Sequence, residues 1–150
     1  SGSGESELPR RIGVLRVEMD VAVAASLISG TLRAEPGDGA ESILPGVEAR
    51  ITLRREQNGA TMLGVEYRLP VGDERPWFVR AEVLDDEGRV LAVVENASEV
   101  ETRDSVLGSV PIWNIDTRSA PAYSVRLQFV PAGATMRIEI VERDLPLLGG

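Results

Sequence analysis

The stretch that decides the fold runs from Pro76 to Ala97 and reads PWFVRAEVLDDEGRVLAVVENA. Its first half alternates between two sets of residues, a period of two that predicts a β-strand. The two sets are Trp77, Val79, Ala81 and Val83 against Phe78, Arg80, Glu82 and Leu84. The cluster 85–88 (DDEG) favours chain reversal, because its glycine tolerates a positive φ. The apolar run 89–94 then predicts a returning strand, so the whole stretch predicts a β-hairpin.

The preceding segment repeats this design. Residues 47–56 alternate between apolar and polar positions, and Asn58-Gly59 follows them. This dipeptide is a strong hairpin signal, because both residues tolerate the positive φ of a type I′ turn. The return strand places five residues on one face: Thr61, Leu63, Val65, Tyr67 and Leu69. Two hairpins in tandem predict a meander or a Greek-key segment.

The N-terminal part opens with a further alternation over residues 11–35. Its apolar phase consists of Val17, Met19, Val21 and Val23. We expect one strand here and a second through Leu32, because Gly30 and the flanking β-branched residues disfavour a helix. Residues 35–46 (EPGDGAESILPG) hold two prolines and three glycines, which predicts a loop. Ile43 and Leu44 are expected to anchor this loop to the core or to a partner.

The C-terminal part contains the least regular segment. Residues 95–108 are polar and poorly periodic, which predicts either a short helix or a loop with an edge strand. Pro111 suits an edge strand over 110–115 better than a central one. Residues 123–129 alternate clearly, and the last strand carries Met136, Ile138 and Ile140 after a turn at 131–133. Residues 145–150 (LPLLGG) are expected to leave the body as an extended apolar tail.

Short strands separated by turns, with almost no helical periodicity, predict an all-β antiparallel β-sandwich, immunoglobulin-like or jelly-roll-like. We expect one domain over residues 11–144, preceded by a linker or cloning remnant at 1–10 and followed by the tail at 145–150. The DDEG turn and the strand VRLQFV at 125–130 resemble those of bacterial immunoglobulin-like and fibronectin-III-like modules. This resemblance implies a fold and no activity.

The composition narrows the classes of function. The 150 residues carry a net charge of −8, and all 16 basic residues are arginines. An acidic protein gains no counterion release from nucleic acid or anionic lipid, so we expect neither as a partner. The sequence has no membrane-spanning apolar run and no leader pattern, so we expect a soluble protein without membrane insertion, its compartment open. The absence of cysteine and histidine removes thiol chemistry and the commonest general base and metal ligand.

Carboxylates are therefore the remaining candidates for acid–base or metal chemistry. They gather in the 85–87 turn and again at Glu99, Glu101 and Asp104. In exposed turns they are expected to be solvated and to titrate normally. A loose calcium pattern at Glu35, Asp38 and Glu41 lacks EF-hand spacing, and the triplet 96–98 (NAS) matches an N-glycosylation acceptor. We expect no catalytic residue, no cofactor and no metal site.

The aromatic and apolar residues divide by strand phase. The two tryptophans and two tyrosines would form a stacking platform for a sugar if they faced solvent together. Tyr67, Trp77 and Tyr123 fall on the phase expected to face the core, whereas Trp113, near Pro111 and Asn114, is the least committed of the four. Three apolar residues fall on the phase expected to face outward: Met62, Phe78 and Val94. Such an apolar stripe indicates a second buried face or a protein interface.

The end of the chain supports an alternative. A strand at 135–144 (TMRIEIVERD) followed by Gly149 and Gly150 resembles the C-terminus of ubiquitin-like modifiers. The resemblance implies a C-terminal β-grasp domain after a β-rich one, with the 77–94 hairpin as its first strands and 97–107 as its helix. It also implies conjugation through the di-glycine, and the lack of lysine would prevent self-conjugation.

From these observations we expect a non-enzymatic β-sandwich module for protein–protein interaction or structural assembly. Its partner would be another protein or a second copy. The alternatives are the ubiquitin-like modifier and a carbohydrate-binding module. The candidate interaction residues are Ile43, Leu44, Trp113, Leu145, Leu147, Leu148, Gly149 and Gly150.

Overall fold

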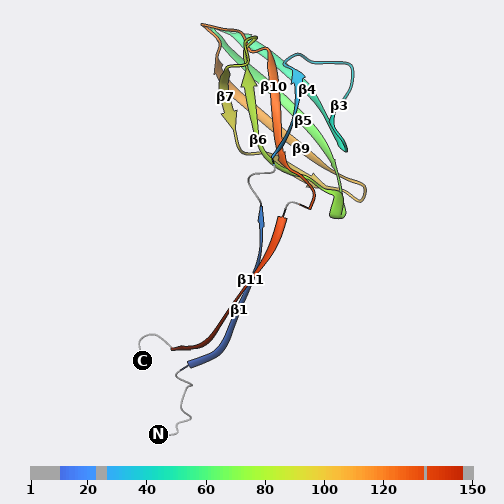
Figure 1. Cartoon of the computed structure of the whole chain (residues 1–150). Coiled ribbons are helices and arrows are strands. Elements are labelled where there is room, and N and C mark those ends of the chain that lie inside the picture. Colours follow the sequence, from blue (N-terminus) through green and yellow to red (C-terminus); the bar gives the residue numbers. More distant parts are fainter. Residues whose placement is uncertain (1–10, 23–26, 134, 147–150) are drawn as a thin grey trace. The chain divides into compact units, whose positions relative to one another are not determined.

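A computed structural model describes residues 11–22, 27–133 and 135–146 (Figure 1). The chain divides into two units, Ser1–Ala22 with Thr135–Gly150, and Val23–Ala134. The described residues form strands and one short 3-10 turn, Gly72–Glu74, and no α-helix. The strands are β1 Arg11–Ala22, β2 Ile28–Arg33, β3 Glu41–Leu44, β4 Val47–Gln57, β5 Ala60–Pro70, β6 Trp77–Leu84, β7 Val90–Val94, β8 Ser98–Glu101, β9 Ser105–Asp116, β10 Ser124–Val130 and β11 Thr135–Pro146.

The larger unit is an antiparallel β-sandwich, as the alternation predicts. One sheet has the order β2-β10-β6-β7, and the other has the order β3-β4-β5-β9-β8. Every pairing between neighbouring strands is antiparallel. The predicted Asn58-Gly59 turn joins β4 to β5, with φ angles of 52° and 78°. The all-β prediction is confirmed.

The smaller unit is a two-stranded antiparallel ribbon of β1 and β11, which we call the terminal ribbon. Our prediction placed β1 and residues 135–144 in the same sheet system as the other strands. They instead pair with each other, from Arg11 opposite Pro146 to Ala22 opposite Thr135. Strand β11 also continues through Leu145 and Pro146, two residues into the predicted tail. Residues 23–26, with Val23 of the predicted first strand, lie outside the described residues.

Of the two alternatives predicted for residues 95–108, the structure shows the loop with an edge strand. Strand β8 lies at the edge of the five-stranded sheet and pairs with β9, where Val100 lies directly opposite Leu107 across the ladder. A tight turn reverses the chain between the strands, where Thr102 N donates to Ser105 O at 2.7 Å. The β-grasp alternative needs a helix at this place, so the fold does not support it.

Three aromatic rings form the centre of the sandwich core. Phe129 is completely buried, and its ring meets Tyr67 and Phe78 edge-on at centroid distances of 5.6 and 5.9 Å. Tyr67 and Phe78 are stacked at 5.2 Å. Tyr67 comes from one sheet and the two phenylalanines come from the other. The rings therefore join the two layers, with the offset and edge-to-face geometry that aromatic pairs prefer.

A β-bulge reverses the predicted orientation of the start of β6. The pairing with β10 runs from Leu84 to Arg80 and resumes at Phe78, so Val79 has no partner. One extra residue turns every residue before it to the opposite face. Phe78 therefore packs against the core, whereas Trp77 is 48% exposed. The prediction had these two residues the other way round.

Two more predicted orientations change for local reasons. Val94 was expected to face outward, but it pairs with the buried Ala81 and packs against the core. Tyr123 was expected in the core and is exposed, because the regular ladder of β10 begins only at Ser124. The Arg33 guanidinium covers the Tyr123 ring at 5.4 Å. Met62, also predicted outward, is half-buried.

The loop predicted at 35–46 contains the short edge strand β3, which pairs with β4. Ile43 and Leu44 are half-buried and pack against the core. Ile43 lies directly over Gly30 of β2, where an added Cβ would come within 2.7 Å of the Ile43 side chain. The glycine thus allows the edges of the two sheets to approach each other here.

The turn between β6 and β7 depends on a buried carboxylate. Asp85 accepts hydrogen bonds from Glu87 N at 2.9 Å, Arg89 N at 2.8 Å and Arg89 Nε at 2.9 Å. Burial opposes ionisation, yet these donors together hold the pKa of Asp85 below its ordinary value. The prediction of a solvated turn carboxylate was wrong for this residue. Gly88, with φ 81°, supplies the predicted reversal.

We expect stability to fall in acid because of this carboxylate. An Asp whose folded pKa is depressed contributes stability above its unfolded pKa of 3.8, and this is lost as the pH falls through the lower folded value. Asp116 acts in the same direction, since the Arg118 guanidinium and N–H lower its pKa to about 2. Urea unfolding measured between about pH 7 and pH 2 tests this. In Asp85→Asn, the free energy of unfolding should fall less steeply as the pH is lowered. The same fall in the variant and in the natural chain would contradict this role of Asp85.

Candidate interaction surfaces

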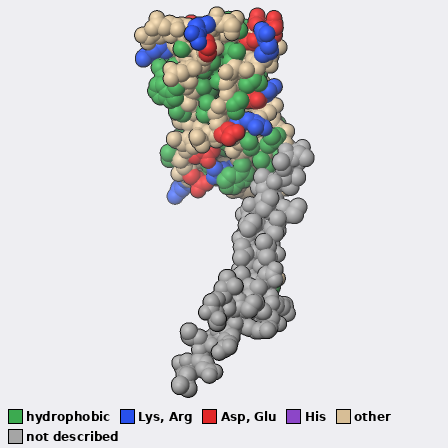
Figure 2. All heavy atoms as spheres, turned by 90° about the vertical axis from the view of Figure 1, so that its left-hand side faces the viewer, with side chains coloured by type: hydrophobic (Ala, Val, Ile, Leu, Met, Phe, Trp, Pro, Cys, Tyr) green, Lys and Arg blue, Asp and Glu red, His purple; other side chains and the backbone are tan. Residues whose placement is uncertain are grey.

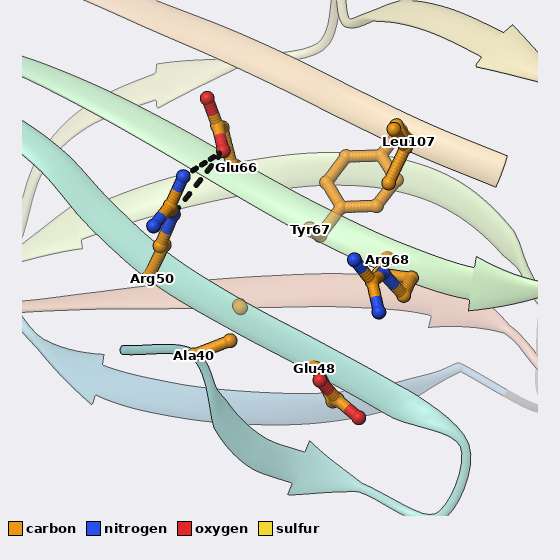
Figure 3. A pocket seen from close by; sticks show the side chains of 8 residues that line it. Ala40, Glu48, Arg50, Glu66, Tyr67, Arg68 and Leu107 are labelled. Carbon is orange, nitrogen blue, oxygen red and sulfur yellow. Dashed lines mark hydrogen bonds and ion pairs between the residues drawn. The ribbon is translucent and has the colours of Figure 1, made fainter. Parts of the chain in front are cut away.

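Shallow hollows lie on the outer face of the five-stranded sheet. The first, of about 190 Å³, lies across β4, β5 and β9 (Figure 3). Arg50 crosses its floor and donates to Glu66 Oε1 through Nη2 at 3.0 Å and Nε at 3.2 Å. Glu48 and Arg68 form the next register pair along the same face. Paired charges this exposed contribute little to the stability of the fold.

An apolar pair lies at one end of this face. Val100 of β8 and Leu107 of β9 are directly opposite each other, and they are 64% and 42% exposed. They line a hollow of about 370 Å³ together with Ser98, Ser109 and neighbouring residues. Both belong to the segment whose periodicity was poorest, and only the pairing of β8 with β9 brings them together.

Leu53 of β4 is an exposed apolar residue at the other end of this face. A bulge in β4 leaves Thr52 without a partner between Ile51 and Leu53, so Leu53 points outward and Arg54 inward. Arg54 Nη1 then donates to Ala34 O at 2.7 Å. The alternation of apolar and polar residues over 47–56 predicts that Leu53 faces the core, and this prediction is wrong.

Trp113, the predicted platform, is exposed on β9 near this end. It is 64% exposed and lines a hollow of about 180 Å³ that we call the Trp113 hollow. The residues lining it are Arg55, Gln57, Asn58, Ala60, Thr61, Met62, Trp113 and Asn114. They come from the β4–β5 turn and from β9, so two segments distant in the sequence build it.

A polar cluster closes the end of the sandwich below Tyr67. The Tyr67 hydroxyl donates to Glu99 Oε2, and burial followed by this hydrogen bond raises the pKa of Tyr67 far above its ordinary value. Arg75 Nη2 donates to Glu99 Oε1 at 2.7 Å, and its guanidinium lies 4.2 Å from the centre of the Trp77 ring. Glu99 on the edge strand β8 is thus engaged by both neighbours. This arrangement is structural, and inward-facing charge also protects a sheet edge from further pairing.

The four-stranded sheet presents a different outer face. Its central strands carry polar pairs there, such as Arg126 donating to Glu82 at 2.8 Å and Arg80 donating to Gln128. Exposed apolar residues concentrate on its edge strand β7, at Val90 and Val93. In Figure 2, which views the side on which β7 lies in Figure 1, apolar patches alternate with charged groups. Edge strands of this kind are open to further pairing.

The structure describes four of the predicted interaction residues. Ile43 and Leu44 lie against the core at one sheet edge, Trp113 lies on an outer face, and Leu145 belongs to the terminal ribbon. Residues 147–150, with Leu147, Leu148, Gly149 and Gly150, lie outside the described residues. Within the sandwich, Ile43 and Leu44 lie on β3 and Trp113 lies on β9. Leu53, Val100 and Leu107 were missed, because their exposure follows from bulges and pairing.

The terminal ribbon is the most asymmetric of the candidate surfaces. Its register places three apolar residues of β1 opposite three of β11: Val17 with Ile140, Met19 with Ile138 and Val21 with Met136. Period-two geometry assigns these six to one face. The rungs between them pair Arg16 with Val141, Glu18 with Glu139 and Asp20 with Arg137, and these belong to the opposite face.

Comparisons with family models, curated proteins and solved structures find no match. In the described part of the chain, no helix is long and apolar enough to cross a membrane. The same residues contain no group of three acidic side chains arranged to hold a metal ion.

Proposed function

We propose that this protein is a non-enzymatic β-sandwich module for protein–protein interaction or structural assembly, with the terminal ribbon as its assembly element. The observation that carries the proposal is the register of β1 and β11. It pairs six apolar residues with one another over three alternate rungs. A two-stranded sheet is marginally stable in water unless another layer covers its apolar face. An interacting layer would therefore stabilise the ribbon.

A second copy of the chain is the partner that fits this face. The same apolar face on two copies is self-complementary about a two-fold axis, the commonest symmetry of protein dimers. Burying one such face contributes roughly 9–18 kcal/mol, and a symmetric pair buries two. Association costs about 4–15 kcal/mol, which is less than the apolar contribution of the two faces together. The charged rungs would remain in water on the outside of the pair.

The proposal predicts concentration-dependent self-association. Light scattering after size exclusion should show the full chain shifting from monomer mass towards dimer mass. Ile140→Arg places a charge on the apolar face and should weaken the association at least tenfold, on the order of 1.4 kcal/mol. Val141→Arg makes the same change on the opposite face, at the next residue, and should leave the association unchanged.

Two results would count against this proposal. One is a monomer at every concentration up to about the millimolar range. The other is an equal effect of the Ile140 and Val141 substitutions. Loss of folding is monitored separately, because Trp77 and Trp113 both lie in the sandwich unit and report on it by their emission.

We also infer an immunoglobulin-like or fibronectin-III-like subclass for the sandwich. The inference is supported by the tandem hairpins β4–β5 and β6–β7. It is supported too by the position of β10 between β2 and β6, far from both in sequence. Greek-key sandwiches contain such non-sequential neighbours.

A further inference from the structure

A β-bulge in β9 places Asn114 beside Trp113 on the outer face of the sheet. The ladder with β5 pairs Leu63 with Ile112 and Thr61 with Ile115, so Met62 faces two residues, Trp113 and Asn114. Asn114 has φ 53°, the left-handed conformation that glycine and asparagine accept most readily. Bulges redirect side chains and recur beside binding sites. Here Trp113 faces outward by the regular alternation of β9, and the bulge places Asn114 on the same face beside it, next to the half-buried Met62.

Polar side chains surround the indole in the Trp113 hollow. Gln57, Asn58 and Asn114 contribute three carboxamides, and Arg55 contributes a guanidinium. Each carboxamide offers two donors and an acceptor, and the guanidinium offers five donors. The adjacent Arg54 is engaged by Ala34 O and Glu56, whereas no hydrogen bond within the described residues occupies these four side chains. No acidic residue lines the hollow, although the whole chain carries a charge of −8.

We propose that the Trp113 hollow binds one pyranose ring of a carbohydrate. A pyranose has an apolar C–H face that packs flat on an aromatic ring, and hydroxyl groups that both donate and accept hydrogen bonds. An exposed indole flanked by carboxamides matches both features. A protein hot spot would need a desolvated apolar pocket, which this hollow does not offer.

This site belongs to the sandwich and does not depend on the terminal ribbon, so each proposal can fail while the other stands. A hollow this shallow, with one stacking ring, predicts weak binding of a single sugar, with a Kd on the order of a millimolar. Several copies assembled together would strengthen the binding of a polysaccharide by multivalency.

The chain holds two tryptophans, which makes a direct test possible. In a Trp77→Phe background, Trp113 is the only indole, and its emission reports on the hollow. Titration with a panel of methyl glycosides (gluco-, galacto-, manno-, N-acetylglucosaminyl and fucosyl) to about 50 mM should give a saturable change with at least one of them. Saturation-transfer NMR on the natural chain should show the same sugar, and Trp113→Ala should abolish its signal while Trp77→Ala retains it.

The two asparagines allow a matched control of the polar contacts. Asn114→Gly and Asn58→Gly remove a carboxamide and keep a residue that accepts positive φ, so the bulge and the turn persist. At least one should weaken binding fivefold or more. The proposal is overturned if no glycoside of the panel gives a saturable change. It is equally overturned if Trp113→Ala binds as well as the natural chain, or if both glycine variants keep full affinity.

Discussion

Phe129→Ala is expected to lower the free energy of unfolding by about 3–5 kcal/mol, the usual effect of truncating a fully buried phenylalanine. Phe129 is 0% exposed and contacts the rings of Tyr67 and Phe78. Its removal would leave a cavity between the sheets. Tyr67 or Phe78 could fill this cavity only by giving up the stacking contact between them. Urea unfolding monitored by tryptophan emission would measure the change.

Trp77→Ala is the matched comparison for this prediction. The two residues belong to adjacent strands, and Phe129 and Phe78 are register partners. Because the bulge at Val79 turns Trp77 outward, its truncation should cost less than about 1 kcal/mol, mainly through the lost stacking of Arg75. An effect of Trp77→Ala equal to that of Phe129→Ala would show that the bulge is absent.

Gly108→Ala is expected to destabilise the sandwich by about 3 kcal/mol, the upper end of the usual range for overpacking a core. Gly108 lies directly opposite Tyr67 in the ladder, and an added Cβ would overlap the Tyr67 ring. The ring has nowhere to move, because Phe78 stacks on it and Glu99 holds its hydroxyl. Thermal unfolding monitored by circular dichroism would measure the loss.

Two controls separate crowding from the general effect of replacing glycine. Gly39→Ala has nothing within 4 Å of the new Cβ and should be neutral or slightly stabilising. Tyr67→Leu in the Gly108→Ala background removes the overlapping ring. The double variant should therefore lose less stability than the two single effects predict together. Strict additivity would mean that the ring and the glycine are not in contact.

The sequence predicted some of the residues on the candidate surfaces and missed others. Trp113 was singled out by its place beside Pro111, and the structure shows it exposed beside three carboxamides. Asn114 is the sequence neighbour of Trp113, but the carboxamides of Gln57 and Asn58 could not be foreseen, because only the pairing of β5 with β9 brings them near the indole. The exposed Leu53 was missed because a bulge placed it there.

The sequence by itself determined the strands and their turns. Alternation, Asn58-Gly59 and the DDEG cluster depend on neighbouring residues, and local backbone preference is sufficient for each. Tertiary structure decided which strands pair, where bulges fall and therefore which residues face the core. The first and last strands, β1 and β11, pair with each other. The bulge at Val79 places Phe78 against the core and leaves Trp77 exposed. Both depend on a partner strand distant in sequence, and a shift of one residue in its register turns every side chain to the other face.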